Sequence, residues 1–148
     1  MKERYPYSFP DLVQRHFGFM HHHGFSGVFS SESKVRYEST KAYVEITHEE
    51  RDSEVALLFG RIANEEKFSF TLFLRLKNPA LEKEFGERLA VDAVEVESCL
   101  AKLAGALRSE GEEILRGEDL VFEQMKNVRW WHFQPEALKK SSEHRPLE

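Results

Sequence analysis

The sequence predicts a single α+β domain: an antiparallel sheet of about four strands, with an N-terminal helix and two to three C-terminal helices packed on it. Three observations lead to this class. An apolar stripe at helical spacing opens the chain, apolar and polar residues then alternate over several short segments, and helical spacing returns in the second half. A length of 148 residues fits one domain over 1–148, and we expect about 1–6 and 141–148 to be frayed.

The first helix is expected from about Phe9 to Met20, where apolar residues recur every three or four positions. Ser8 precedes this stripe and is a suitable N-cap, because its hydroxyl can accept a hydrogen bond from a free backbone N–H of the first turn. Gly24 can end the helix in a left-handed conformation. The first helix therefore has both a start signal and a stop signal.

Alternating residues predict the strands that follow. A hairpin is expected from 35–37 and 42–46, a third strand over 55–59, and the longest alternation over 68–76, with a further short strand over 27–30. Because the connections between them are short, we expect consecutive strands to be antiparallel neighbours.

Helical spacing returns after the strands. A short helix is expected over 79–86, the longest helix from the capping residue Asp92 to about Gly117, and a last one from Asp119. We expect the first helix and the longest helix to cover the same face of the sheet. The longest helix would pack on the sheet through an apolar stripe at Val96, Leu100, Leu103, Leu107 and Ile114.

Composition narrows the class of protein. With 41% hydrophobic and 32% charged residues the chain is an ordinary globular one, and its net charge of -5 argues against binding nucleic acid by general charge attraction. No apolar run approaches the length that spans a bilayer, and residues 1–6 lack the apolar segment of a signal peptide. Cys99 is the single cysteine, which excludes an intrachain disulfide and favours a reducing compartment. We therefore expect a cytoplasmic protein that binds neither membrane nor nucleic acid.

Histidines form the most conspicuous local motif. His21, His22 and His23 are consecutive and His16 lies nearby, and imidazoles are common ligands of zinc, copper and nickel. However, no two of them have the i, i+4 spacing that places two ligands on one helical face. We favour the alternative that this run marks a helix end, where imidazolium groups meet the carbonyl dipole. No metal and no cofactor is expected.

The turn between the second and third predicted strands of the meander is acidic. Its side chains lack the spacing and the glycine of a calcium loop, so we expect either a solvated turn or a docking surface for a basic partner. The acidic residues are Glu49, Glu50, Asp52 and Glu54.

A second candidate surface lies on the sheet beside this turn. Tyr43 and Glu45 are expected to face away from the core, and the same face of the next strand, with Leu58, is more apolar than a solvated surface requires. This strip could bind a partner protein, join two copies as a homodimer, or be sealed by the chain's own C-terminal segment. That segment carries Trp130 and Trp131, which either seal the end of the sheet or contribute to binding.

Three passages carry a resemblance to a known group of proteins. They are the helix of 12–25 that ends in Gly-Phe, the hairpin of 35–39 and 42–46, and the segment 114–119. In these passages the chain resembles small bacterial proteins of unknown function, some of which are presumed to be immunity proteins of toxin systems. The resemblance implies a bacterial cytoplasmic origin and a protein partner.

No nucleophile motif, phosphate-binding loop or metalloprotease motif is present, so no catalytic residue is predicted. We therefore expect a non-enzymatic protein-interaction module, of which immunity-type binding to a partner protein is the concrete form. The alternative is a small-molecule-binding domain or an enzyme that uses the concave face of the sheet.

Overall fold

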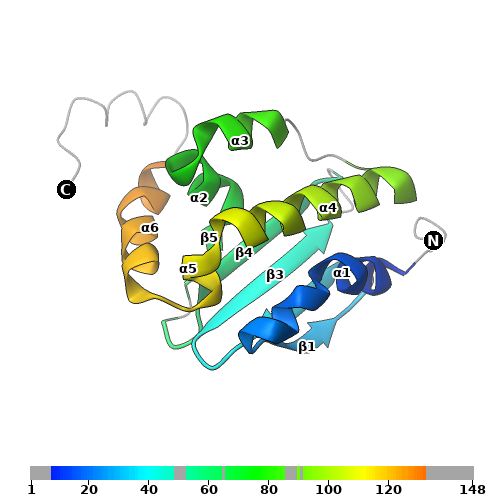
Figure 1. The fold of residues 1–148 in the computed structure, drawn as a ribbon, viewed down its shortest axis with the longest axis horizontal. Coiled ribbons are helices and arrows are strands. Elements are labelled where there is room, and N and C mark those ends of the chain that lie inside the picture. Colours follow the sequence, from blue (N-terminus) through cyan, green and yellow to red (C-terminus); the bar gives the residue numbers. More distant parts are fainter. Residues whose placement is uncertain (1–7, 49–52, 65, 86–89, 91, 133–148) are drawn as a thin grey trace.

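The computed structural model describes residues 8–48, 53–64, 66–85, 90 and 92–132, with the backbone alone at 85 and 128–132 (Figure 1). It confirms the predicted α+β class. Five strands form one antiparallel sheet, and they follow one another across it in chain order. The strands are β1 (Ser26–Ser30), β2 (Lys34–Glu38), β3 (Ala42–His48), β4 (Val55–Arg61) and β5 (Phe68–Ser69).

Helices cover one face of this sheet. Figure 1 shows α1 and α4 lying side by side in front of the strands, as the sequence predicts, and the two helices contact each other. The helices are α1 (Phe9–Phe17), the 3-10 helix η2 (Gly18–His23), α2 (Phe70–Lys77), α3 (Pro79–Phe85), α4 (Ala93–Glu110), α5 (Glu112–Leu115) and α6 (Asp119–His132).

Three predicted capping positions are present in the structure, although the first α-helix ends at Phe17, before the predicted Met20, and continues as η2. The Ser8 hydroxyl accepts a hydrogen bond from the backbone N–H of Asp11 at 3.4 Å, and the Asp92 carboxylate accepts one from the N–H of Glu95 at 2.8 Å. Gly24 ends η2 in the left-handed conformation, with φ of 84°. These positions follow from local chemistry, because each satisfies a backbone group that a helix leaves free.

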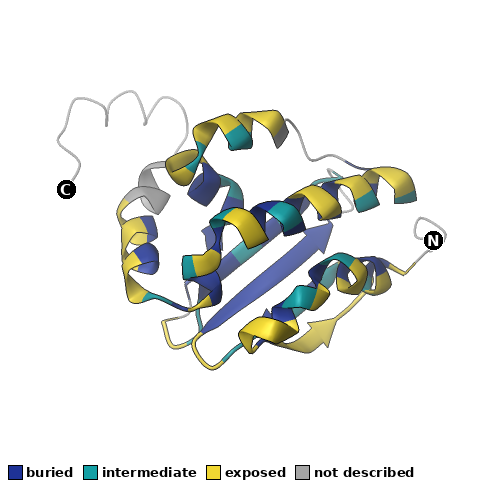
Figure 2. Cartoon of the chain, viewed as in Figure 1, coloured by how far each residue is buried: buried dark blue, intermediate teal, exposed yellow. Residues whose placement is uncertain are grey.

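The core lies between the sheet and the helices. On the helix side of the sheet, Val44 and Ile46 of β3 and Phe59 of β4 are fully buried. The apolar stripe of the predicted long helix is buried as expected, at Val96, Leu100, Leu103, Leu107 and Ile114. Figure 2 shows the contrast within the sheet: β3 is buried, whereas β1 is exposed.

The prediction of a strand over 68–76 is wrong beyond Ser69. Phe68 and Ser69 form the short strand β5, and the chain then turns into the helix α2. The Ser69 hydroxyl caps this helix by accepting a hydrogen bond from the N–H of Leu72 at 3.3 Å. The alternating pattern places Leu76 with the buried residues, but Leu76 is 46% exposed, whereas Phe73 from the other phase of the pattern is buried. An apolar run of this length fits both periods, and a capping serine together with packing on the core decides for the helix.

The long helix predicted up to Gly117 is in fact interrupted at Gly111. The helix α4 ends at Glu110, and α5 begins at Glu112. A Cβ at Gly111 would collide with the Leu107 backbone carbonyl and side chain one turn earlier, so a glycine is needed at this close approach. The stripe stays buried across the break because Leu107 and Ile114 both face the core.

Candidate functional site

The face of the sheet opposite the helices carries a network of paired charges. Arg36 of β2 donates hydrogen bonds from Nε to Glu38 and from Nη1 to Glu45, both at 2.7 Å. Its guanidinium carbon lies 3.9 Å from the centre of the Tyr43 ring. Burial lowers the pKa of Arg36, but the hydrogen bonds to Glu38 and Glu45 outweigh it, so this pKa lies above its usual value. Arg36 therefore remains a cation and acts as a cross-strand connector.

Tyr43 and Glu45 are more buried than their alternation in the sequence predicts. Their exposed fractions are 4% and 6%, because the Arg36 side chain lies against both and the residues around Glu66 lie beside Tyr43. The Tyr43 hydroxyl donates a hydrogen bond to the Glu66 backbone carbonyl at 2.5 Å. These two side chains face away from the helix side of the sheet, as expected, but they are not exposed there, because both take part in a network within the chain.

A glycine in β4 makes this arrangement possible. Gly60 is the partner of Tyr43 in the register of β3 and β4, and a Cβ at Gly60 would overlap the backbone carbonyl of Glu66. The turn after β4 can therefore lie directly on the strand only because residue 60 has no side chain. An isolated glycine within an apolar strand is a signal of such a close approach, and it could have located this site from the sequence.

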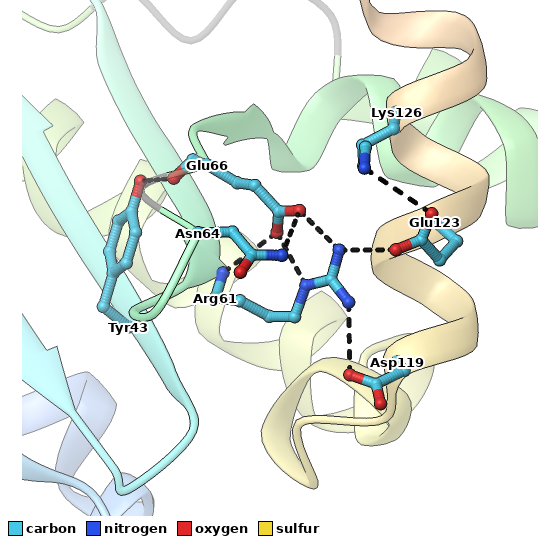
Figure 3. Close-up of polar contacts among 7 residues, drawn as sticks. All are labelled: Tyr43, Arg61, Asn64, Glu66, Asp119, Glu123 and Lys126. Atoms are coloured by element: carbon cyan, nitrogen blue, oxygen red, sulfur yellow. Dashed lines mark hydrogen bonds and ion pairs between the residues drawn. The ribbon is translucent and has the colours of Figure 1, made fainter.

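Arg61, the next residue, lies on the helix side of the sheet and is the centre of a second network, which shares Glu66 with the first (Figure 3). Its guanidinium donates hydrogen bonds from Nε to Glu66 Oε1 at 3.0 Å and from Nη2 to Glu66 Oε2 at 2.5 Å. It also reaches two residues of α6, with Nη1 3.2 Å from Asp119 and Nη2 2.8 Å from Glu123. One side chain therefore connects β4, the following turn and the C-terminal helix.

The pKa values around Arg61 follow from these contacts. The hydrogen bonds to Glu66 and Glu123 raise the pKa of Arg61, against the effect of burial. Burial by itself would raise the pKa of Glu66, but hydrogen bonds from Arg61 and Asn64 outweigh it, so the Glu66 pKa lies below its usual value. Both groups are thus firmly charged at neutral pH. General acid–base catalysis instead favours a group whose pKa is moved toward neutrality.

A cavity of about 410 Å³ opens beside this cluster. It lies between the β2–β3 turn, the β4–β5 turn and the loop before α6. Its charged groups are the Lys41 ammonium, the Arg61 guanidinium and the Asp119 carboxylate, whose side chain is 84% exposed. The cavity has the size and polarity to admit a small polar molecule. It is lined by Thr40, Lys41, Arg61, Ile62, Ala63, Asn64, Gly117 and Asp119.

The opposite end of the sheet is different in character. β1 is an edge strand in which all five residues are exposed, and its two large apolar residues, Val28 and Phe29, are each 52% exposed. The register with β2 shifts between Gly27 and Phe29, which indicates a β-bulge at Val28. We call β1 and the residues beside it the open end, and the region of β4, β5 and α6 around Arg61 the closed end.

A groove of about 300 Å³ runs along β1 on the helix side of the sheet. Tyr37 and Val35 of β2 line it, together with the exposed Gln14 of α1. The Tyr37 hydroxyl is buried and has no hydrogen-bond partner among the described residues. The groove is lined by Gln14, Gly27, Val28, Phe29, Ser30, Val35 and Tyr37.

The structure does not bring the other predicted site residues together. His21, His22 and His23 lie exposed in η2, while His16 on α1 lies 3.1 Å from Glu97 of α4. Within the described part of the chain, no group of three His, Cys, Asp or Glu side chains is placed to hold a metal ion.

The predicted acidic turn is described only at one end. Glu54, just before β4, is half-buried, while Glu49, Glu50 and Asp52 lie outside the described residues. Trp130 and Trp131 belong to α6, and their side chains also lie outside the described part of the chain.

Several residues at these two ends were not among the candidate site residues predicted from the sequence, including Val28, Phe29, Tyr37, Gly60, Arg61 and Glu66. Over the residues that the structure describes, no helix has the length and apolar character needed to cross a membrane. Comparisons of the chain with protein-family models, with curated proteins and with solved structures found no match.

Proposed function

We propose that this protein is a non-enzymatic protein-interaction module that binds a partner protein through the open end of its sheet. The observation that carries the proposal is the state of β1, whose outer edge faces no other strand of the described residues and whose residues, Val28 and Phe29 among them, are all exposed. An exposed apolar edge strand is a surface to which another chain readily adds, and natural proteins protect such edges unless they use them.

The remainder of the described surface supports this reading. Each pKa that departs from its usual value in the described part of the chain moves away from neutrality, as the Arg61 and Glu66 pair illustrates. Such groups stabilise a structure and are poorly suited to transfer protons. Immunity-type binding, in which the module covers a functional surface of its partner, is the concrete form, and the resemblance to presumed bacterial immunity proteins supports it. A cytoplasmic setting and a basic partner, attracted by the net charge of -5, are part of the same proposal.

The test is site-specific photo-crosslinking in the native host. A photoreactive amino acid at position 28 or 29 should capture a defined protein, identified by mass spectrometry. The matched control is position 94, because Val94 on α4 is also apolar and is 78% exposed. The purified partner should then bind the Val28→Lys variant at least about tenfold more weakly than the Val94→Lys variant. Equal capture from both positions, or equal affinity of the two variants, would contradict the proposal.

A second candidate function is favoured by the cavity beside Arg61. Its polar lining and its volume of about 410 Å³ suit a small polar molecule, which is the alternative that the sequence left open. Thermal shift measurements with a metabolite library would detect it. A hit whose stabilisation is lost in Lys41→Met, and retained in Val28→Lys, would favour this candidate over the protein-binding one.

A further inference from the structure

The Tyr37 hydroxyl is the unusual group at the open end. Tyr37 is 2% exposed, and its hydroxyl has no hydrogen-bond partner among the described residues. A buried hydroxyl without a partner is unfavourable, and native structures contain few of them. Burial raises the pKa of Tyr37, so the group keeps its proton and is available as a donor. An unused donor at a docking edge points to an acceptor that a bound partner supplies. Because the hydroxyl is closed to solvent, that acceptor reaches it only when the Tyr37 side chain turns toward the groove on binding.

The register of β1 and β2 explains why the groove beside Tyr37 is empty. Gly27 is the partner of Tyr37 and Ser30 is the partner of Val35, so the two residues of β1 that pair with the helix-side residues of β2 are small. A Cβ added at Gly27 would lie 3.9 Å from the Tyr37 ring, an ordinary contact distance, which confirms that there is space. Phe29 pairs with Arg36 and lies on the opposite face. The groove of about 300 Å³ therefore has room for a large side chain that this strand does not provide.

We propose that the groove receives an Asn or Gln side chain from an extended segment of the partner, which adds to β1 as a further strand. The amide oxygen accepts the hydrogen bond of the Tyr37 hydroxyl, and the amide N–H groups face the Gln14 side chain on α1. A neutral amide suits this place better than a carboxylate, because a buried charge without a counter-ion is costly. The inference rests on the proposed function and adds the chemistry of the partner segment.

A second copy of this chain fits the groove less well. If two β1 strands paired, the residues that the register places on the helix side, Gly27 and Ser30, would be too small to fill the groove. The bulge at Val28 also interrupts the regular alternation that a symmetric pair of strands needs. The occupant is therefore a different sequence.

The experiment uses the full chain and peptides of defined sequence. Random nonapeptides displayed on phage are selected on the protein, and a selected peptide is then synthesised with Gln or with Leu at the conserved amide position. The Gln peptide should bind Tyr37→Phe about three- to tenfold more weakly than the parent protein, the effect of one hydrogen bond. The Leu peptide should bind both proteins equally.

Two further variants establish whether the peptide occupies the groove. Gly27→Val narrows the groove and should weaken the Gln peptide at least about tenfold. Val94→Lys, on the exposed face of α4, should leave its affinity unchanged. Tyr37→Phe should unfold at the same denaturant concentration as the parent protein or a higher one, since its hydroxyl makes no hydrogen bond with the described residues.

Three results would overturn the inference. The first is a selection that yields no peptide dependent on Gly27 and Tyr37, and the second is equal sensitivity of the Gln and Leu peptides to Tyr37→Phe. Either one, together with specific crosslinking at positions 28 and 29, would leave the proposed function intact. The third is a dimer at micromolar concentration in sedimentation that Val28→Lys dissociates, which would make a second copy the occupant.

Discussion

The two edges of the sheet differ in how far the rest of the chain covers them. At the closed end, Arg61 joins β4 to its following turn and to α6, and Phe122 of α6 packs on Phe59 and Phe68 with ring centres 6.0 and 6.5 Å away. At the open end, β1 contributes no buried residue. The edge strand β5 is only two residues long and leads directly into a helix, whereas β1 presents five residues.

Because of this difference, we expect the closed end to contribute mainly to the stability of the fold and the open end mainly to partner binding. The closed end is completed by contacts within the chain, so changes there should mainly alter the free energy of unfolding. The open end pairs with β2 but buries none of the residues of β1, so changes there should mainly alter binding. Substitutions of the same residue type at the two ends should therefore change the free energy of unfolding by different amounts.

The largest effect on stability is expected at Phe122 of the closed end, and Phe29 of the open end serves as its comparison. Phe122→Ala should lower the free energy of unfolding by about 3–5 kcal/mol, because Phe122 is fully buried and its removal leaves a cavity beside two other aromatic rings. Phe29→Ala should change it by less than about 0.5 kcal/mol, because Phe29 is half-exposed. Urea denaturation of both variants is the measurement, and similar losses would remove the distinction between the ends.

Glycine substitutions give the next largest effect. Gly60→Ala should cost at least about 2 kcal/mol, because its Cβ would overlap the Glu66 carbonyl and displace the turn that carries the Arg61 partner. The matched control is Gly105→Ala in α4, where a Cβ would meet nothing within 4 Å. Alanine favours a helix over glycine, so the control should gain about 0.5–1 kcal/mol. A Gly60→Ala protein as stable as the parent in the same denaturation assay would contradict the packing of residue 66 on β4.

A smaller effect is expected from pH at the closed end. The folded-state pKa of Glu66 lies below its value in the unfolded chain, which is near the usual 4.5. The unfolded state therefore takes up the proton first as pH falls. The stability that Glu66 contributes is complete well above the unfolded-state pKa, decreases as pH falls through that value, and is lost once pH falls below the folded-state pKa.

Glu66→Gln tests this directly. The variant should lose part of its stability at pH 7, and the difference between variant and parent should shrink as pH falls from 5 toward 3. Equilibrium unfolding at closely spaced pH values is the measurement, with Glu84→Gln on the exposed surface of α3 as the control. A difference that stays constant over this range would mean that Glu66 is not linked to folding by its charge.

The smallest effect on stability is expected at the open end. Val28→Lys should shift the free energy of unfolding by less than about 0.5 kcal/mol, since the side chain is already half-exposed at an edge. Lysine on an edge strand opposes the addition of another strand, so partner binding should fall while folding is unchanged. A loss of stability comparable to that of Gly60→Ala would show that β1 is part of the folding core.

Local chemistry in the sequence was sufficient for much of the framework. The cap at Ser8, the left-handed Gly24 and the cap at Asp92 each act within a few residues, and the structure contains all three. Alternation located β2, β3 and β4, because one face of each strand meets the core. Signals of this kind depend on residues close in the chain, so they can be read without the fold.

Contacts between distant segments decided the rest. The run after Ser69 is compatible with a strand or a helix, and its packing on the core, together with the Ser69 cap, selects α2. The pairing of Arg61 with Asp119 and Glu123 joins residues that are 58 and 62 positions apart, which no local pattern encodes. Tyr43 alternates like a solvent-facing residue, yet the turn after Gly60 lies beside it and buries it. Whether a polar face is solvated depends on which segment lies over it, and that is a property of the tertiary structure.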